Sequence, residues 1–451
     1  MTNATFKNAR TFEGPVDFGS TSTFNASIPT TSLTPTTSTQ FMTKGAADST
    51  YLPQSPTNPG IAYTGTVFSP LWGPVTSVNL LKTDGTQTGA ISAFNFLFPI
   101  VEPGLLTLDL GTVTALNNLQ FTTFPALTSF TASSLLYSFG SFIGTFSVLT
   151  SFSLPNVLYM ASFSITAPLL TSLSLPSLIM CNTFNPTVAA LTTVSLPSLT
   201  TVEGNFNITG ISLTSLTAPS LTIAGGNFSG SCTLLTSLSL PALTYIGSFV
   251  PTSYPALTTL SMPLLTTING AMTLGTLASL TSLTLSALTT VSGALTGTMA
   301  SLTSFSAANL VTVSGALTLT LAGATSVTLT NLSVVSGAVA LTCATLTSLT
   351  LPAITSLGST FAITAANMTS FSMNSGLLSV GGNFTMSGMK LDAASVNGIL
   401  VSLAALDGTG GTTAYSSKTV NLSGGTSAAP SGAGATAKTT LQGRGCTVTT
   451  N

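Results

Sequence analysis

Acidic and basic side chains are the first candidates for chemistry in this sequence, and they are few. The 451 residues include 8 Lys and Arg, 9 Asp and Glu and no His. General acid and base catalysis needs titratable groups that converge on one cleft. Between residues 110 and 389 the only Asp, Glu, Lys or Arg is Glu203, so a glycosidase-like carboxylate pair cannot be assembled there. We expect no enzyme activity and no catalytic residue, and we interpret Glu203 as an exposed turn residue.

The four cysteines show no pattern typical of a metal site. Cys181, Cys232, Cys343 and Cys446 lie far apart in the sequence. Cys232 and Cys343 share a position in the repeat described below, but five repeats separate them, which is too far for a disulfide. We expect isolated buried thiols and no metal or other cofactor, and the cysteines leave the redox compartment undetermined.

Hydroxyl side chains form the one surface pattern with a regular geometry. In segments such as Ser282-Leu283-Thr284, the alternation predicts a half-buried strand with leucine inward and hydroxyls outward. Such a face could bind a glycan or receptor, match an ice lattice or pack against a neighbouring subunit. Alternatively, Ser and Thr simply suit an exposed strand. The candidate residues are Ser172, Ser174, Thr193, Ser195, Ser215, Thr217, Ser237, Ser239, Thr259, Ser261, Ser282 and Thr284.

A repeated phrase must position these hydroxyls. The phrase Leu-Thr-Ser-Leu-Ser-Leu-Pro begins at Leu170 and returns in related form at Leu191, Leu213, Leu235 and Leu257, in steps of 21 or 22 residues. A fixed period of this length indicates a solenoid, in which each coil buries its apolar face against its neighbours. We predict an all-β solenoid of about 13 coils of about 22 residues, with two strands per coil and no helix between them.

A glycine returns once per coil and predicts a corner of the backbone. A glycine at one fixed point of every coil indicates either a positive φ or a close backbone approach. Proline follows the first strand in many coils and would end that strand, because proline has no N–H. The recurring glycines are Gly204, Gly225, Gly247, Gly270, Gly293, Gly315, Gly337, Gly358 and Gly381.

The two ends of the chain differ from the repeats. We divide the chain into an N-terminal shaft and connector (1–60), an N-terminal cap (61–104), the solenoid (105–391) and a C-terminal cap (392–451). Asp392 is placed to begin a helix from Ala393 to about Leu406, and the tail predicts a strand, a Gly-rich loop, a short helix and a final strand. The cap 61–104 holds Trp72 and several other aromatic residues. We interpret them as part of the cap, and a platform that binds a ligand is the alternative interpretation. Four phenylalanines six residues apart predict a thin segment that associates with other chains: Phe6, Phe12, Phe18 and Phe24.

Three stretches resemble known families. The phrase LTTVEGNFNITG followed by LTSLTAPSL resembles receptor L-domains and bacterial surface leucine-rich repeats, which implies a scaffold or binding surface over about 290 residues. The N-terminal stretch FKNARTFEGPVDFGSTSTF with FMTKGAADSTYLP resembles bacteriophage tail-fibre and related virion proteins. The tail is similar to a C-terminal module of phage structural proteins that usually ends Gly-Trp-x-Val, where this chain has Gly445-Cys446-Thr447-Val448.

Composition and resemblance together favour a virion structural protein. A net charge of −1 without a basic patch argues against nucleic-acid binding. Apolar runs are too short for a membrane-spanning helix, and the first residues lack the apolar core of a secretory signal. We therefore expect a non-catalytic fibre or spike-like appendage on the virion. Its partners would be itself, as a homotrimer, other virion proteins and a host glycan or receptor. The alternatives are an extracellular or cell-surface leucine-rich-repeat adhesin and, third, an ice-binding protein.

Overall fold

The computed structural model describes residues 106–110, 114–121 and 124–451, together with the backbone of four short strands nearer the N-terminus. Two of these form an antiparallel pair, β1 (Ala62–Thr64) and β2 (Val67–Ser69). The described chain forms two compact units. The first runs to Glu203 and includes Asn207–Leu213, and the second contains Gly204–Phe206 and Thr214–Asn451. The predicted associating phenylalanines, Phe6 to Phe24, and Trp72 lie outside the described residues.

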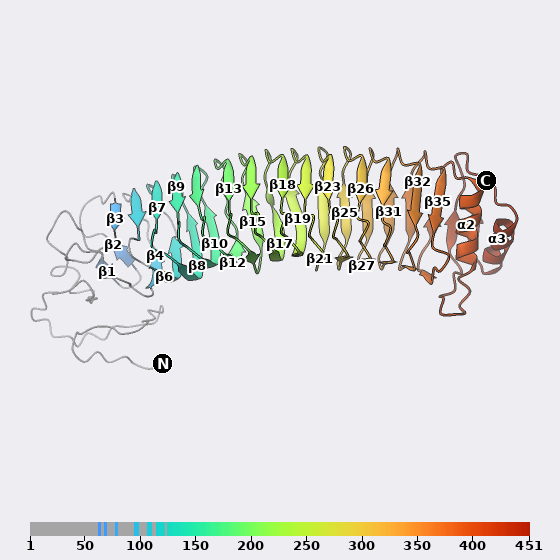
Figure 1. Ribbon diagram of the computed structural model, residues 1–451, viewed down its shortest axis with the longest axis horizontal. Coiled ribbons are helices and arrows are strands. Elements are labelled where there is room, and N and C mark those ends of the chain that lie inside the picture. Colours follow the sequence, from blue (N-terminus) through green and yellow to red (C-terminus); the bar gives the residue numbers. More distant parts are fainter. Residues whose placement is uncertain are drawn as a thin grey trace, which may run out of the picture. The chain divides into compact units, whose positions relative to one another are not determined.

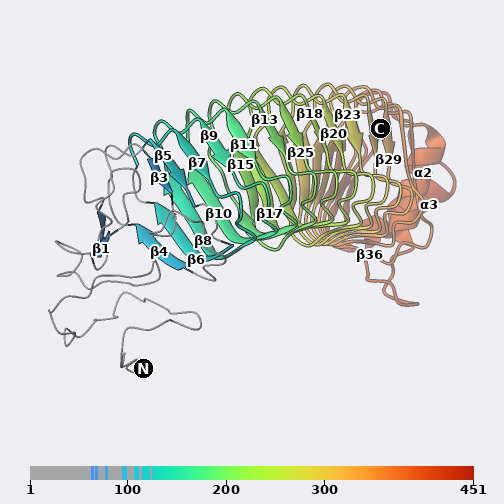
Figure 2. The ribbon, with the colours of Figure 1, turned by 60° about the vertical axis from the view of Figure 1, so that its left-hand side comes forward.

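Parallel strands that recur about every 22 residues build both units, so the predicted β-solenoid is confirmed, with about 12 turns. In the first unit, three-residue strands lie on one side of the coil, the first five of them paired in register, and strands of two to nine residues form the other side (Figures 1 and 2). The three-residue strands are β3 (Ser77–Asn79), β5 (Thr107–Asp109), β7 (Ser129–Thr131), β9 (Ser151–Ser153), β11 (Ser172–Ser174) and β13 (Thr193–Ser195). The other side consists of β4 (Phe94–Phe98), β6 (Ala115–Phe121), β8 (Tyr137–Thr145), β10 (Tyr159–Thr166), β12 (Met180–Phe184) and β14 (Thr201–Val202).

The second unit repeats this plan, and β15 (Phe206–Thr209) lies where the chain passes between the units. Its first side consists of β16 (Ser215–Thr217), β18 (Ser237–Ser239), β20 (Thr259–Ser261), β23 (Ser282–Thr284), β26 (Ser304–Ser306), β29 (Ser326–Thr328), β32 (Ser348–Leu351) and β35 (Ser370–Met373). Its other side begins with β17 (Ile223–Ser231) and β19 (Tyr245–Ser253).

Each later coil of the second unit has two short strands on that other side, one before the recurring glycine and one after it. Sequence analysis predicted only the strand after the glycine. The earlier strands are β21 (Thr267–Ile268), β24 (Thr290–Val291), β27 (Thr312–Val313), β30 (Val334–Val335), β33 (Ser356–Leu357) and β36 (Ser379–Val380). The later strands are β22 (Met272–Thr276), β25 (Leu295–Thr298), β28 (Leu317–Thr320), β31 (Val339–Thr342), β34 (Phe361–Thr364) and β37 (Phe384–Thr385).

The core is a stack of like residues. The recurring leucine is buried in every described coil, for example Leu213, Leu235 and Leu280 with 0% exposure, and Ala324 and Met368 take its place with equal burial. Rings also stack: Phe206, Phe228 and Phe249 of the second unit have centroids 4.8 and 5.5 Å apart. This order follows from the repeat, since a side chain one period later lies directly above its counterpart.

The recurring glycine is required by close approach of backbones. No member of the glycine series has a positive φ. At Gly337 an added Cβ would lie 2.6 Å from the Gly315 carbonyl carbon and the Ala316 nitrogen of the preceding coil. The Gly337 N–H also donates to the Gly315 carbonyl at 3.0 Å. Of the two reasons predicted for this glycine, contact between coils is therefore the one that applies.

The C-terminal cap closes the last coil as predicted. Helix α2 (Ala393–Ala404) begins at Asp392, whose carboxylate accepts from the Ser395 N–H at 2.8 Å, and this bonding lowers the pKa of Asp392. The buried Ser395 hydroxyl accepts from the Phe371 N–H of β35 at 2.9 Å. The helix therefore covers the edge of the last strand on that side, an edge that would otherwise expose unpaired backbone groups.

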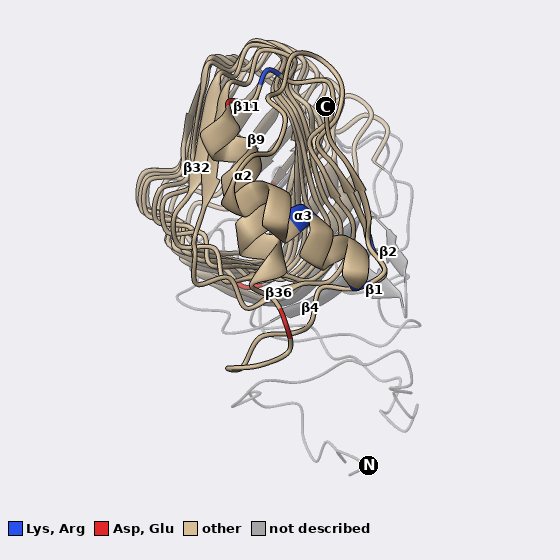
Figure 3. Ribbon diagram, turned by 90° about the vertical axis from the view of Figure 1, so that its right-hand side faces the viewer, with Lys and Arg blue, Asp and Glu red and all other residues tan. Residues whose placement is uncertain are grey.

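The rest of the tail continues the other side of the coil. Strand β38 (Thr419–Asn421) pairs with β37, and β39 (Thr447–Thr449) pairs with β38 after helix α3 (Ala433–Gly443). Helices α2 and α3 lie across this end of the second unit, where its Lys and Arg residues are also found (Figure 3). No helix in the described part of the chain is long and apolar enough to cross a membrane.

We predict that Gly337→Ala lowers the free energy of unfolding by roughly 1–3 kcal/mol, because the new methyl group would push neighbouring coils apart. The matched control is Gly398→Ala on α2, where nothing lies within 4 Å of the added Cβ. That change should stabilise the protein by up to about 1 kcal/mol through helix propensity. Denaturant unfolding followed by circular dichroism measures both. Equal effects of the two changes would contradict the close-approach argument.

Candidate interaction surfaces

The predicted hydroxyl residues lie outward, as expected. All twelve are exposed or half-buried, whereas the central residues Leu216, Leu238 and Leu260 are buried. In the second unit Ser237, Thr259 and Ser282 are partners in register on adjacent strands, and so are Ser239, Ser261 and Thr284. The outward positions therefore form two columns, which we call the hydroxyl face of that unit.

The first unit has a hydroxyl face of its own. Ser172 and Ser174 are in register with Ser151 and Ser153 of β9, and Thr193 and Ser195 are exposed on β13. Hydroxyls repeat about every 4.8 Å from strand to strand and about 6.7 Å along each strand. Sequence analysis left further members of the two faces out of the candidate set, although the same three-residue pattern marks them: Thr107, Ser129, Thr131, Ser326, Thr328, Ser370 and Ser372.

Another set of threonines binds the coils together. Thr258 donates through both its N–H and its Oγ1 to the carbonyl of Thr236, one coil earlier, at 2.8 and 2.9 Å. We call these residues clamp threonines. They explain the constant threonine of the Leu-Thr phrase, which sequence analysis did not interpret. Others are Thr128, Thr150, Thr171, Thr200, Thr244, Thr266, Thr281, Thr289, Thr325, Thr355 and Thr369.

An exposed aromatic cluster lies on β8 and β10 of the first unit, and sequence analysis missed it. Phe139 is 57% exposed, and its ring centroid lies 5.7 Å from that of Tyr137 and 6.1 Å from that of Tyr159. The Tyr159 hydroxyl donates to the Asn182 Oδ1 atom at 3.4 Å. Tyrosine in this strand position recurs one period apart, at Tyr137 and Tyr159, and this recurrence was the available signal.

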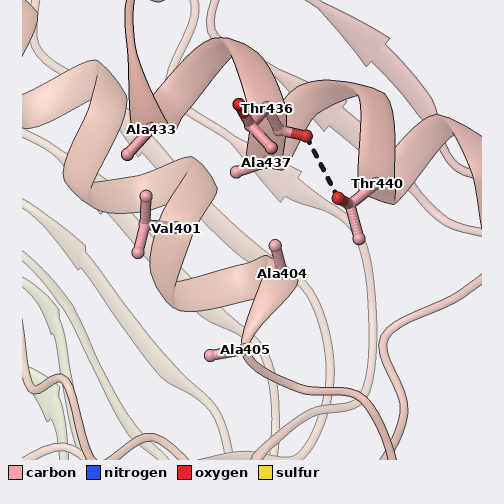
Figure 4. A pocket seen from close by; sticks show the side chains of 7 residues that line it. All are labelled: Val401, Ala404, Ala405, Ala433, Thr436, Ala437 and Thr440. Atoms are coloured by element: carbon pink, nitrogen blue, oxygen red, sulfur yellow. Dashed lines mark hydrogen bonds between the residues drawn. The ribbon is translucent and has the colours of Figure 1, made fainter.

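The C-terminal cap contains an open groove of about 510 Å³ between α2 and α3 (Figure 4). Small side chains line it, and Thr440 Oγ1 donates to the Thr436 carbonyl within α3 at 3.1 Å. None of the lining residues is titratable at neutral pH. They are Val401, Ala404, Ala405, Ala433, Thr436, Ala437 and Thr440.

The titratable residues do not converge. Glu203 is exposed at the bend after β14, as predicted, and the described residues contain no group of three or more His, Cys, Asp and Glu able to hold a metal. All four cysteines are buried and none forms a disulfide, which confirms the predicted buried thiols. Burial raises the pKa of Cys181 to about 12 and that of Cys343 to about 11. These two thiols are therefore protonated at neutral pH and are poor nucleophiles.

Comparison with known proteins gave no relative. No family model, no curated protein and no solved structure matches the chain. Surface geometry and the sequence resemblances are therefore the basis for a proposed function.

We predict that Thr258→Val and Thr259→Val have different effects although they are adjacent and isosteric. Thr258→Val removes the side-chain hydrogen bond to the Thr236 carbonyl and should cost about 1 kcal/mol of unfolding free energy. Thr259→Val alters only the hydroxyl face and should be neutral or slightly stabilising. Denaturant titration of both variants provides the measurement. An equal loss at both positions would show that the clamp is not the distinguishing interaction.

Proposed function

We propose that the protein is a non-catalytic structural appendage of a virion, fibre or spike-like, that serves attachment. The observation that carries this proposal is the division of the coils into an apolar interior and an outer side that bears hydroxyls. The interior is filled with apolar side chains, while the strands of the first side present mostly uncharged hydroxyls outward, in register on β18, β20 and β23. Such a scaffold displays surface over a long stretch of chain without building a reaction cleft. The resemblance of the N-terminal stretch to tail-fibre proteins supports the virion location.

The proposal assigns assembly to the N-terminal stretch. Phe6, Phe12, Phe18 and Phe24 would pack between copies of the chain, giving a homotrimer that joins other virion proteins. A thin segment of this kind buries too little apolar surface to fold as one copy, and association provides the missing burial. The solenoid would then be the displayed part.

The mass of the full-length protein in solution tests this assignment. Light scattering should give a trimer or larger assembly for the full chain, and a monomer for a chain that begins at Tyr51. A full-length variant with Phe12 and Phe18 changed to Ser should also be monomeric, and Phe305→Leu in the solenoid core serves as the control that stays assembled. A monomeric full-length protein would contradict assembly through the N-terminal shaft and favour a free-standing cell-surface adhesin.

The two hydroxyl columns support a second candidate function, binding to ice. A regular, uncharged array is a feature that such binding needs, and the second unit provides it over β16, β18, β20 and β23. If this function applies, the protein shows thermal hysteresis. Thr217→Tyr and Thr284→Tyr should each abolish it, while Thr330→Tyr in a turn should not. Absence of hysteresis in the unmodified protein removes this candidate.

A further inference from the structure

Phe139 departs from the repeat in a way that points to a ligand. The following coils of the first unit have Ala161, Asn182 and Glu203 at this outward position, all small or polar. Phe139 is the most exposed large apolar side chain in the described part of the chain. An exposed ring contributes little to the stability of the fold, because the stabilising free energy comes from burial of apolar area.

The alternation of β8 places this ring outward, and a β-bulge begins at the same residue. Between the pairs Ser138↔Met160 and Ser141↔Ser162, β8 has two residues, Phe139 and Gly140, where β10 has only Ala161. The fully buried Ser138 hydroxyl donates to the Gly140 carbonyl at 3.4 Å and so supports the bulge from inside. Bulges commonly re-aim a side chain beside a functional site.

The rings of Phe139 and Tyr137 form an exposed pair on β8, which we call the aromatic patch. Tyr137, which is 38% exposed, stacks on Phe139 with an interplanar angle of 11°, and both rings lie on the outer face of β8. Ala161 on the next coil offers only a methyl group. One coil further on, about 10 Å from Phe139 by strand spacing, Asn182 presents its amide. Glu203 follows on the third coil, and its N–H donates to the Cys181 carbonyl at 3.0 Å.

We infer that this aromatic patch binds a neutral carbohydrate, an inference that rests on the proposed attachment function. A pyranose ring has an apolar C–H face, which can stack on Phe139 and Tyr137. The hydroxyls of the next sugar units in the same glycan can pair with the amide of Asn182 and the carboxylate of Glu203, which lie about 10 and 14 Å from Phe139 by strand spacing. The carboxylate is a strong acceptor. The described residues of the first unit include no Lys or Arg to neutralise an acidic sugar, and Glu203 would repel one. The charge at the site therefore favours a neutral glycan.

The hydroxyl faces are a weaker place for the same ligand. Hydrogen bonds between neutral groups only replace bonds to water, and each gives a net gain of about 1 kcal/mol at best. The aromatic patch adds burial of an exposed ring and aromatic stacking to its hydrogen bonds. It is also a single feature of the described coils, so it can fix the position of a ligand, whereas a repeated column cannot.

Binding of the full-length protein to immobilised neutral oligosaccharides tests this inference, with cellohexaose, maltohexaose, mannohexaose and chitohexaose as probes. We expect binding to at least one probe, weakened roughly tenfold or more by Phe139→Ala. Phe139→Trp should retain it. The control is Tyr245→Ala at the first position of β19 in the second unit, which is the strand position that Tyr137 occupies in β8, and it should leave binding unchanged. Because the Phe139 ring is more than half exposed, its removal should lower the melting temperature by only a few degrees.

Three results would overturn the carbohydrate assignment. The first is that the unmodified protein binds none of the four probes. The second is binding that survives Phe139→Ala. The third is a reduced mass in solution for Phe139→Ala, which would show that the ring contacts a second copy of the chain. The first two results do not bear on assembly through residues 1–50, which the mass of the truncated chain tests independently.

Discussion

The requirement that each coil hydrogen-bond to the next in register governs this structure. Parallel strands one period apart place every side chain directly over its counterpart, about 4.8 Å away. The residue type at each position of the coil must therefore pack well against the same position of the adjacent coils, as well as fit its own surroundings. Glycine meets this requirement at the bend, where Gly337 lies against Gly315, and phenylalanine meets it in the core, where Phe228 stacks between Phe206 and Phe249.

The same requirement accounts for the low charge. A charged residue repeated in every coil would form a column of like charges, each neighbouring pair repelling by about 1 kcal/mol even in water. Hydroxyls have no such penalty, because each can both donate and accept. Asp109 and Glu203 occur once each in their columns, beside Thr131 and Asn182. The scarcity of Asp, Glu, Lys and Arg is thus a property of stacking in register, independent of whether the protein performs catalysis.

Much of this architecture could be predicted from the sequence because the repeat expresses it many times. The period, the inward leucines and the outward hydroxyls each recur in almost every coil, and the N-cap at Asp392 has a local signature in Asp392 and the apolar face that follows. Two-residue strands such as Thr290–Val291 were missed because they are too short to show alternation. The clamp threonines were missed because their bonds join residues 21 to 23 apart, which no local pattern reveals.

Functional specificity has to come from positions that break the repeat. The energetic demands on a given coil position are nearly the same in every coil, so a departure that the fold does not need must have another cause. Lys390 and Arg444 depart from the pattern at the cap, where Lys390 donates to Asn367 Oδ1 and Arg444 donates to the Leu406 carbonyl. Their departure is structural. Phe139 has no such explanation, because its ring faces solvent and the neighbouring coil manages with alanine. By this reasoning the uniform hydroxyl faces give the scaffold a broad uncharged surface, and the exception at Phe139 is where we propose a site.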